Sequence, residues 1–214
     1  MIRIYGIDWR TLPRAEELFS ALRSDLRAVA LSRYEKTHTQ DQLRAGLAGL
    51  LLLQASGADG TLRYDENGRP FFLEGKADFN ISHTRTMTFC AVNDGETPPD
   101  IRVGLDAEDG DRLSEERLAS LAKRWFSEQE QSRFFADPTP HSFLTIWTGK
   151  EAMVKYSGEG LRALSQADTD SADKIGLCLH SYSLADTVIT LCARQGVAVC
   201  KEISVCSSDR LIQK

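Results

Sequence analysis

The stretches VGLDAE at residues 103–108 and WTGKEAMVK at residues 147–155 carry most of what this sequence reveals. In the first, apolar residues alternate with Asp106 and Glu108, a pattern typical of a β-strand whose two carboxylates project from the same side. In the second, Glu151 and Lys155 stand four residues apart in a helical stretch, so they share one helix face. If the strand packs on the helix, three carboxylates and one lysine come together.

Such a cluster of like charges would repel itself unless a cation lay among the carboxylates. An all-oxygen site suits Mg²⁺, with Mn²⁺ as an alternative ion, and Mg²⁺ is often bound by one or two carboxylates together with substrate phosphates. These residues therefore favour a metal-assisted reaction on a phosphate ester. Two ordinary alternatives stay open on the residues alone. Asp106 and Glu108 could form the solvated face of an edge strand, and Glu151 and Lys155 an exposed ion pair.

The composition narrows the classes of function. The 214 residues include 26 Lys and Arg against 31 Asp and Glu, a formal net charge of −5, which argues against non-specific binding to nucleic acid or to an anionic membrane surface. Five cysteines without CxxC spacing indicate neither a disulfide framework nor a zinc site, so a cytoplasmic location is expected. The N-terminus lacks the pattern of a signal peptide, and the longest apolar run, Leu47–Leu53, is too short to span a membrane.

Turn-forming residues at 93–99 divide the chain, so the sequence predicts two domains, residues 1–97 and 98–214. The first half is predicted to contain a strand, helices and a small antiparallel sheet, with Asn67-Gly68 as a hairpin signal. Its expected elements are a strand at Ile2–Ile7, helices at Ala15–Val29 and Asp41–Gln54, and strands at Leu62–Tyr64, Phe71–Phe72, Phe79–Ser82 and Met87–Val92.

The second half follows a similar order of strand, helices and strands. Ser127 with Glu130 three residues later predicts a capping box at a helix start. The fold class is therefore predicted as α+β. The expected elements are a strand at Arg102–Glu108, helices at Ser114–Phe126, Ser127–Phe135 and Ser142–Tyr156, and a closing antiparallel meander of Ile175–Ser183, Val188–Ala193 and Val197–Val205.

Further short motifs flank the two opening stretches. They are GRP at residues 68–70, FNISHT at 79–84, RWFS at 124–127 and GEGL at 158–161. In this order, together with GLDAE at 104–108 and WTGKEAMVK at 147–155, they resemble the signature motifs of the 4′-phosphopantetheinyl transferases of the surfactin-synthetase-activating type. One departure is Ala107, which stands where that family has a larger aliphatic residue. The resemblance spans roughly residues 33–161.

The resemblance implies a particular α+β fold and metal site. The fold would consist of two similar halves related by a pseudo-twofold axis, each a small antiparallel sheet packed on a long helix, with the active site in the cleft between the halves. Asp106, Glu108 and Glu151 would hold Mg²⁺. Lys155 would lie against the pyrophosphate of coenzyme A, and Glu151 would be the candidate base for the incoming serine.

The resemblance also assigns residues of the first half to coenzyme A. Ser82 and His83 would contact its phosphate groups, with His83 next to the 3′-phosphate. Arg44 matches a basic helix residue that faces the same phosphate, and Arg69 matches a basic loop residue near the nucleotide. The family usually has two lysines upstream for the 3′-phosphate. Here the candidates without a clean match are Arg27, Arg33 and Lys36.

The activity that the resemblance implies is transfer of 4′-phosphopantetheine from coenzyme A to a serine of an apo acyl or peptidyl carrier protein, with release of adenosine 3′,5′-bisphosphate. The rival interpretations are a Mg²⁺-dependent nucleotide phosphohydrolase and a relative that binds coenzyme A or a carrier protein without turnover. A monomer is expected, because two fused halves complete the site.

Three further expectations concern side chains around these motifs. Ser114–Phe135 is expected to form part of the carrier-protein dock through Lys123 and Arg124, with Leu118 as either a contact or a core residue. Lys150 is expected to be a helix-surface charge or a nucleotide contact rather than a catalyst. Trp147 is expected to pack in the core.

Overall fold

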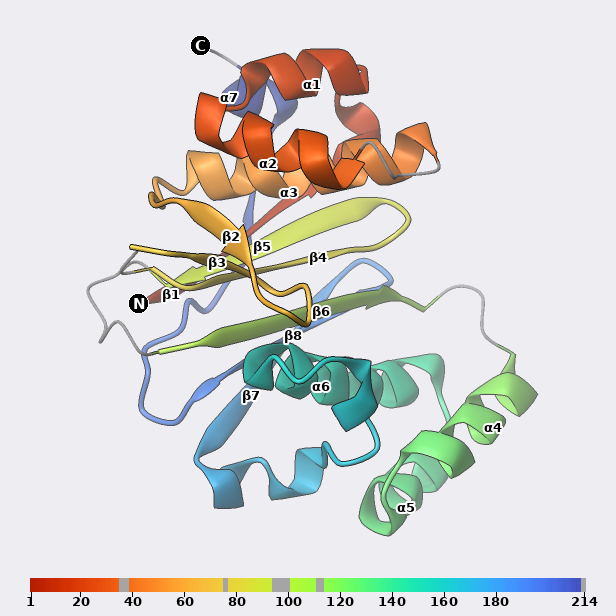
Figure 1. Cartoon of the computed structure of the whole chain (residues 1–214). Helices are drawn as coiled ribbons and strands as arrows, with labels where there is room; N and C mark the ends of the chain where they lie inside the picture. Colours follow the sequence, from red (N-terminus) through yellow and green to blue (C-terminus); the bar gives the residue numbers. More distant parts are fainter. Residues whose placement is uncertain (35–38, 75–76, 94–100, 111–113, 213–214) are drawn as a thin grey trace. The chain divides into compact units, whose positions relative to one another are not determined.

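The structure is a computed structural model that describes residues 1–34, 39–74, 77–93, 101–110 and 114–212 (Figure 1). It confirms the mixed α+β class, and the chain divides into two compact units, Met1–Ile101 with Ala198–Lys214, and Arg102–Val197. Lys36 lies outside the described residues, and the side chain of Arg33 is likewise not described. Among the helices that are described, none combines the length and apolar character needed to cross a membrane.

The first unit is built on a four-stranded sheet. Its strands are β1 (Ile2–Asp8), β4 (Phe79–His83), β5 (Met87–Asn93) and β9 (Ser204–Val205), in the order β4-β5-β1-β9. β5 pairs antiparallel with both β4 and β1, whereas β9 runs parallel to β1. A separate hairpin consists of β2 (Leu62–Tyr64) and β3 (Pro70–Phe72), and it includes the turn predicted from Asn67-Gly68.

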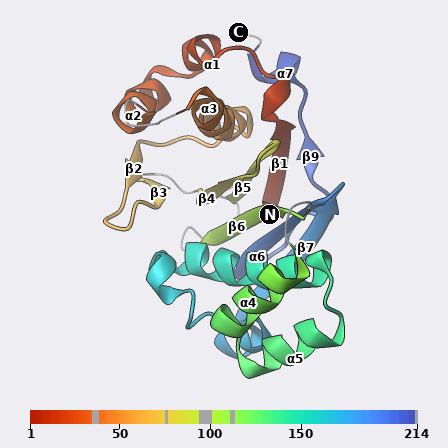
Figure 2. The same ribbon diagram turned by 90° about the vertical axis from the view of Figure 1, so that its right-hand side faces the viewer.

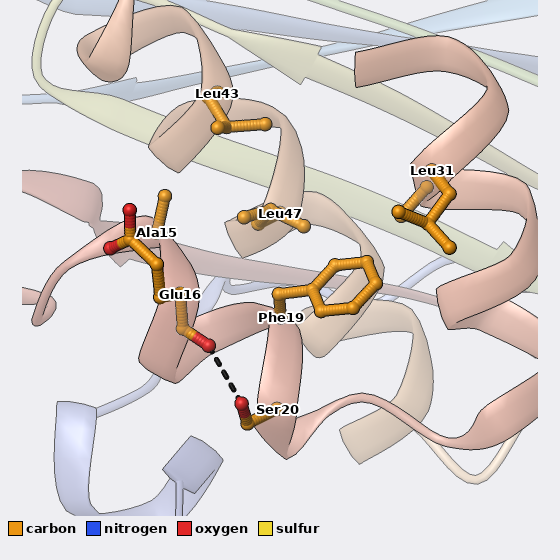
Figure 3. Close-up of a pocket in the computed structure, with 8 residues that line it drawn as sticks. Ala15, Glu16, Phe19, Ser20, Leu31, Leu43 and Leu47 are labelled. Atoms are coloured by element: carbon orange, nitrogen blue, oxygen red, sulfur yellow. Dashed lines mark hydrogen bonds between the residues drawn. The ribbon is translucent and has the colours of Figure 1, made fainter. Parts of the chain in front are cut away.

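Helices cover one face of this sheet (Figures 1 and 2). They are α1 (Ala15–Ala21), α2 (Ser24–Tyr34) and α3 (Gln40–Ala55), preceded by a 3-10 turn at Trp9–Thr11 and joined at the C-terminus by α7 (Ser208–Ile212). Buried leucines of α3 form the middle of the core, which also includes Leu18, Leu26 and Phe79. Phe19, Leu31 and Leu47, one from each of the first three helices, line an apolar pocket of about 410 Å³ (Figure 3).

The single helix predicted at Ala15–Val29 is wrong, because the chain forms α1 and α2 with a break at Leu22, whose ψ is 147°. The side chain of Gln54, on α3, stabilises this break. Its amide nitrogen donates to the Ala21 carbonyl oxygen at 3.1 Å, and its amide oxygen accepts from the Arg23 backbone N–H at 2.7 Å. A residue distant in sequence therefore satisfies both helix ends.

The C-terminal tail does not complete a meander as predicted for Val197–Val205. Instead its backbone follows β1, with Cys200 N–H donating to the Ile2 carbonyl at 2.9 Å and Cys206 N–H to the Gly6 carbonyl at 2.8 Å. The tail therefore groups with the first unit, which differs from the division into residues 1–97 and 98–214. The other two strands of the predicted meander are confirmed.

The second unit has an antiparallel sheet in the order β6-β8-β7. The strands are β6 (Val103–Asp109), β7 (Leu177–Leu184) and β8 (Thr187–Arg194). The helices are α4 (Glu115–Trp125), α5 (Glu128–Ala136) and α6 (Pro140–Ser157), and 3-10 turns lie at Leu161–Ala163, Thr169–Ser171 and Asp173–Ile175. α6 lies along β6 and β8, and α4 and α5 pack on α6 (Figure 1).

Local signals explain where the helices of the second unit begin and end. The capping box of Ser127 and Glu130 is confirmed at the start of α5. α6 begins at Pro140, two residues before the predicted start, because Thr139 caps it by accepting from the Ser142 N–H at 3.2 Å and proline suits the first helical position. It ends at Gly158, whose φ of 77° favours glycine.

Candidate functional site

The site begins with an unusually close approach between β6 and α6. A Cβ atom on Gly104 would lie 2.0 Å from the Ala152 carbonyl oxygen and 2.6 Å from the Tyr156 nitrogen. Only glycine therefore lets this strand rest directly on the helix backbone. Gly104, Asp106 and Glu108 alternate along β6, so they share the face that meets α6.

Acidic side chains gather where β6 and α6 meet. Asp106, Glu108 and Glu151 each offer a carboxylate oxygen, and these atoms lie within 4.8 Å of one another. The Nζ of Lys155 donates to Oδ1 of Asp106 at 2.7 Å, while the Lys155 side chain stays 32 % exposed. The structure thus brings together the four residues that the spacing of the two stretches predicted. Because Asp106 is only 2 % exposed, the alternative of a solvated strand face is wrong for that carboxylate.

Burial and crowding make the carboxyls of Glu108 and Glu151 reluctant to ionise. Burial raises the pKa of Glu151 to about 8, and the neighbouring Asp106 and Glu108 add to the rise while Lys155 opposes it. Burial also raises the pKa of Glu108 to about 7, with Asp106 adding to the rise and Lys155 again opposing it. Lys155 alone therefore does not offset the burial and crowding of these two carboxyls, and a further positive charge would favour the ionised forms of Glu108 and Glu151.

The donor set fits a hard divalent cation. All three candidate ligand atoms are carboxylate oxygens, and neither sulfur nor imidazole takes part in the cluster. Oxygen ligands of this kind are those that Mg²⁺ and Mn²⁺ prefer, whereas a zinc site would contain His or Cys. Asp106, Glu108 and Glu151 are the residues that could hold such an ion.

The neighbouring Lys150 corrects a prediction from the sequence. Its side chain is 1 % exposed, so it is not a helix-surface charge. Its Nζ donates to Oε2 of Glu130 at 2.8 Å and to the Ala167 carbonyl oxygen. Trp147, one turn earlier on α6, is partly buried and stacks on Phe143 with ring centroids 5.8 Å apart, as expected for core packing.

Arg44, predicted to face a phosphate, donates hydrogen bonds to backbone oxygens of the first unit. From α3, its Nε donates to the Pro13 carbonyl at 3.1 Å, and its Nη2 donates to the carbonyls of Trp9, Arg10 and Leu12. Its guanidinium also lies 5.6 Å from the Trp9 ring centroid. These contacts fasten the segment around the first 3-10 turn to α3. Phosphate binding by Arg44 stays a prediction, and it requires the guanidinium to share or exchange these partners.

Arg69 is likewise engaged, in a bidentate pair with Asp78 at 3.0 and 2.6 Å. Its side chain is 9 % exposed, and the pair joins the β2–β3 hairpin to the residue before β4. Ser82 and His83 lie at the end of β4, Ser82 buried and His83 exposed. The exposed imidazole is thus the most accessible of the predicted phosphate contacts in this unit. The roles of all these residues toward coenzyme A stay predictions.

The α4 helix carries side chains of both expected kinds, core residues and exposed charges. Leu118 is fully buried against Phe126 and Phe143, so it belongs to the core rather than to a surface. Lys123 and Arg124 are exposed in the last turn, where the guanidinium of Arg124 lies 5.0 Å from the Trp125 ring centroid. These two charges remain candidates for a docking surface.

Sequence reasoning missed two features of this region. Gly104 was identified only as part of a motif, and the close helix contact that requires glycine could not be seen from spacing. Glu130 was identified as a cap, but its ion pair with Lys150 joins residues 20 positions apart. The only signal in the sequence was that Glu130 and Lys150 each belong to a short recognisable motif.

Comparison with known proteins covers most of the chain. Residues 102–198, nearly the same as the second unit, match the model of the 4′-phosphopantetheinyl transferase superfamily. The chain is 30 % identical over 173 residues to the 4′-phosphopantetheinyl transferase Sfp of Bacillus subtilis, an alignment that covers 75 % of this chain and 72 % of Sfp. It is 28 % identical over 176 residues to the 4′-phosphopantetheinyl transferase HetI of Nostoc sp., covering 75 % of this chain and 71 % of HetI.

Proposed function

Because the chain belongs to the 4′-phosphopantetheinyl transferase superfamily and is an enzyme that transfers phosphopantetheine to carrier proteins, we propose that coenzyme A is the donor and Mg²⁺ the required ion. The acceptor would be a serine hydroxyl of an apo acyl or peptidyl carrier protein, and adenosine 3′,5′-bisphosphate would be released. The observation that carries the proposal is the cluster of Asp106, Glu108 and Glu151 beside Lys155.

The carboxylates would act first as ligands. Asp106, Glu108 and Glu151 would hold a divalent cation, which would neutralise charge on the pyrophosphate of coenzyme A and on the leaving group. Glu151 and Glu108 have pKa values raised to about 8 and about 7 in the absence of a cation. Both would therefore release protons when a cation binds near neutral pH, because ligands bind metal in their deprotonated form.

Lys155 has the position for a second role. Its Nζ neutralises Asp106 at 2.7 Å, yet the side chain is exposed enough to meet a substrate phosphate. It would stabilise the negative charge on the leaving phosphate and could donate a proton from Nζ. Glu151 is the candidate base for the serine hydroxyl. A cation at Glu151 would lower its basicity, so its role as a ligand has the stronger support.

The contacts with coenzyme A in the first unit are part of the proposal. His83 is exposed at the end of β4 and could donate to a phosphate, next to Ser82. Arg44 and Arg69 would bind phosphate only by sharing the carbonyl and Asp78 partners that they now contact. Guanidinium groups suit phosphate oxygens, since they offer several donors in one plane.

The decisive experiment combines the protein with coenzyme A, Mg²⁺ and an apo carrier protein and records intact mass. We expect the carrier to gain the mass of one phosphopantetheinyl group and the reaction to stop when Mg²⁺ is chelated. Hydrolysis of coenzyme A without modification of the carrier would instead support a phosphohydrolase. Binding without any product would support a non-catalytic relative.

Substitutions at the cluster test the residue assignments separately. Asp106→Ala and Glu151→Ala should each abolish transfer but leave the fold intact, because each removes one of several crowded like charges. Circular dichroism and thermal unfolding check the fold. Near-normal turnover of either variant in Mg²⁺ would contradict the assignment of that side chain.

A further inference from the structure

A fully buried ion pair lies on the side of α6 that is not occupied by the carboxylate cluster. Lys150 on α6 and Glu130 on α5 have side chains 1 % and 0 % exposed, and their Nζ and Oε2 atoms are 2.8 Å apart. Burying two charges is costly unless they are paired and their remaining hydrogen-bonding capacity is met. A buried ion pair of this kind therefore requires several further hydrogen-bond partners.

Glu130 has such partners on both carboxylate oxygens. Its Oε2 accepts from the Ser127 N–H at 2.8 Å as well as from Lys150, while Oε1 accepts from the Thr169 N–H at 2.8 Å and the Thr169 hydroxyl at 2.9 Å. Lys150 also donates to the Ala167 carbonyl. We call Glu130, Lys150 and Thr169 the buried hub. It joins the start of α5, the segment 167–169 and the middle of α6.

The hub also lies beside a close contact between the α6 backbone and the side chain of Thr169. A Cβ atom on Gly149 would approach Cγ2 of Thr169 to 2.9 Å, so α6 and the turn at Thr169–Ser171 touch at the residue before Lys150. α6 also rests on Gly104 of β6, through the backbone of Ala152 and Tyr156. The helix is thus in close contact with two other segments near Glu151.

Adjacent residues of a helix are separated by about 100° around its axis, so Lys150 and Glu151 point in different directions from neighbouring positions. With side-chain atoms about 5–6 Å from the axis, a rotation of about 10° would move the Glu151 carboxylate by about 1 Å. A displacement of that size is enough to cost about a hundredfold in a reaction that depends on geometry. Fixing the rotation of α6 therefore matters directly for the cluster.

We infer that the buried hub is a positioning device, in which Lys150 and Glu130 set the rotation of α6 and so hold Glu151 and Lys155 toward Asp106 and Glu108. The inference rests on the proposed role of Glu151 as a metal ligand. Neither Lys150 nor Glu130 touches substrate in this scheme. Lys150 is a positioning residue, and its place next to Glu151 in the motif has a mechanical reason.

The test compares Lys150→Met and Thr169→Ala with Phe134→Leu. Lys150→Met removes the cation of the hub, whereas Thr169→Ala removes the methyl group next to Gly149 and one hydroxyl, which donates to Glu130 and accepts from Nη2 of Arg133. Phe134 is buried on α5, one turn after Glu130, and contacts Phe126 and Phe143, so Phe134→Leu weakens the same region of the core without touching the hub. All three variants are measured well below their melting temperatures, with the folded fraction verified by circular dichroism.

Two readouts separate positioning from stability. The first is binding of Mn²⁺, followed by electron paramagnetic resonance with coenzyme A present. The second is the kcat and KM for coenzyme A. We expect Lys150→Met to weaken Mn²⁺ binding about tenfold or more and to lower kcat by about tenfold to a hundredfold with little change in KM, since the reacting geometry changes. Thr169→Ala should shift both readouts in the same direction by a smaller factor.

Phe134→Leu should lower the melting temperature but leave both readouts within about twofold of the wild type. The inference is overturned if the hub variants bind Mn²⁺ normally, or if Phe134→Leu, when similarly destabilised, loses as much kcat as they do. If Lys150→Met does not fold, Thr169→Ala decides by the same criteria. Failure of the proposed function is distinguishable, because it would appear as an inactive wild type or as an active Glu151→Ala variant.

Discussion

Replacing Gly104 by alanine should separate the two elements that carry the carboxylate cluster. The new Cβ would lie 2.0 Å from the Ala152 carbonyl oxygen, whereas close carbon–oxygen contacts between backbones are about 3.3–3.6 Å. Because the obstacle is helix backbone rather than a movable side chain, β6 and α6 must move apart by about 1 Å. Overpacking of this kind costs about 1–3 kcal/mol of the free energy of unfolding.

The functional loss should exceed the loss of stability. Asp106 and Glu108 move with β6, while Glu151 and Lys155 stay with α6, so a separation of about 1 Å is expected to reduce kcat by about a hundredfold. For a chain of this size the melting temperature should fall by about 2–4 °C per kcal/mol. Differential scanning fluorimetry measures stability, and intact-mass kinetics with a carrier protein measure turnover at a temperature where the variant is folded.

Gly110→Ala is the matched control, because a Cβ at Gly110 would meet its nearest atoms, in Asp186 and Leu144, at 3.4 Å. This variant should keep its melting temperature and its turnover. If Gly104→Ala behaved like Gly110→Ala, the close contact would not be what holds the cluster together. Loss of stability with unchanged turnover would also refute the reasoning, since the geometry of the site would then tolerate the separation.

Three further predictions address charge. When a chelator keeps divalent cations away, the folded protein binds protons at Glu108 and Glu151 more tightly than the unfolded chain does. These protonated groups therefore stabilise the fold below about pH 4.5, and that stabilisation is lost as the pH rises toward 7 to 8. The melting temperature should therefore fall over this range less steeply in Glu151→Gln than in the wild type, and an equal slope would contradict the raised pKa of Glu151. His83→Ala should weaken binding of coenzyme A about tenfold to a hundredfold by calorimetry but hardly affect dephospho-coenzyme A, whereas equal losses would remove the 3′-phosphate assignment. Lys123→Glu with Arg124→Glu should raise the KM for the carrier protein, lessen its salt dependence and spare affinity for coenzyme A, and unaltered carrier kinetics would place the dock elsewhere.

The elements that could be predicted from the sequence are those set by neighbouring residues. Ser127 and Glu130 cap α5, and Gly158 ends α6, because capping depends on side chains within one helical turn. Asn67-Gly68 likewise marks the β2–β3 hairpin. Such signals can be identified without any knowledge of the rest of the chain.

The errors lie where distant residues decide. The break at Leu22 depends on the Gln54 amide, more than thirty residues away, and the tail follows β1 because Ile2 and Gly6 offer their carbonyl oxygens to it. Neither contact leaves a local pattern. The surroundings of Arg44 show the same limit, since its match to a family motif gives no sign of the backbone carbonyls to which its guanidinium donates. Its contact with phosphate stays a prediction.

The candidate site was predictable in its members because strand and helix periodicities place side chains on faces without reference to the rest of the fold. The i, i+2 spacing put Asp106 and Glu108 on one side of β6, and the i, i+4 spacing put Glu151 and Lys155 on one side of α6. Periodicity does not say what lies opposite each face. It therefore located the cluster but gave no reason for Gly104.

Lys150 and Lys155 show how the same side chain takes different roles on one helix. The Lys150 side chain is enclosed with Glu130. Removing the charge of Lys150 would leave a buried carboxylate without its cation, and the free-energy cost of separating the two charges holds Lys150 in place. Lys155 faces a cluster with more negative charge than it can compensate and is about one-third exposed, so it can exchange Asp106 for a substrate phosphate at small cost. A lysine enclosed with a buried carboxylate and a carbonyl oxygen suits positioning, whereas a lysine beside several carboxyl groups and solvent suits binding an anion together with a cation. The difference arises from the atoms around each Nζ. The protein should therefore tolerate arginine at position 155 better than at position 150. Arginine at position 155 keeps a cation at the acids, while at position 150 its larger fork must fit a space that is closed on all sides.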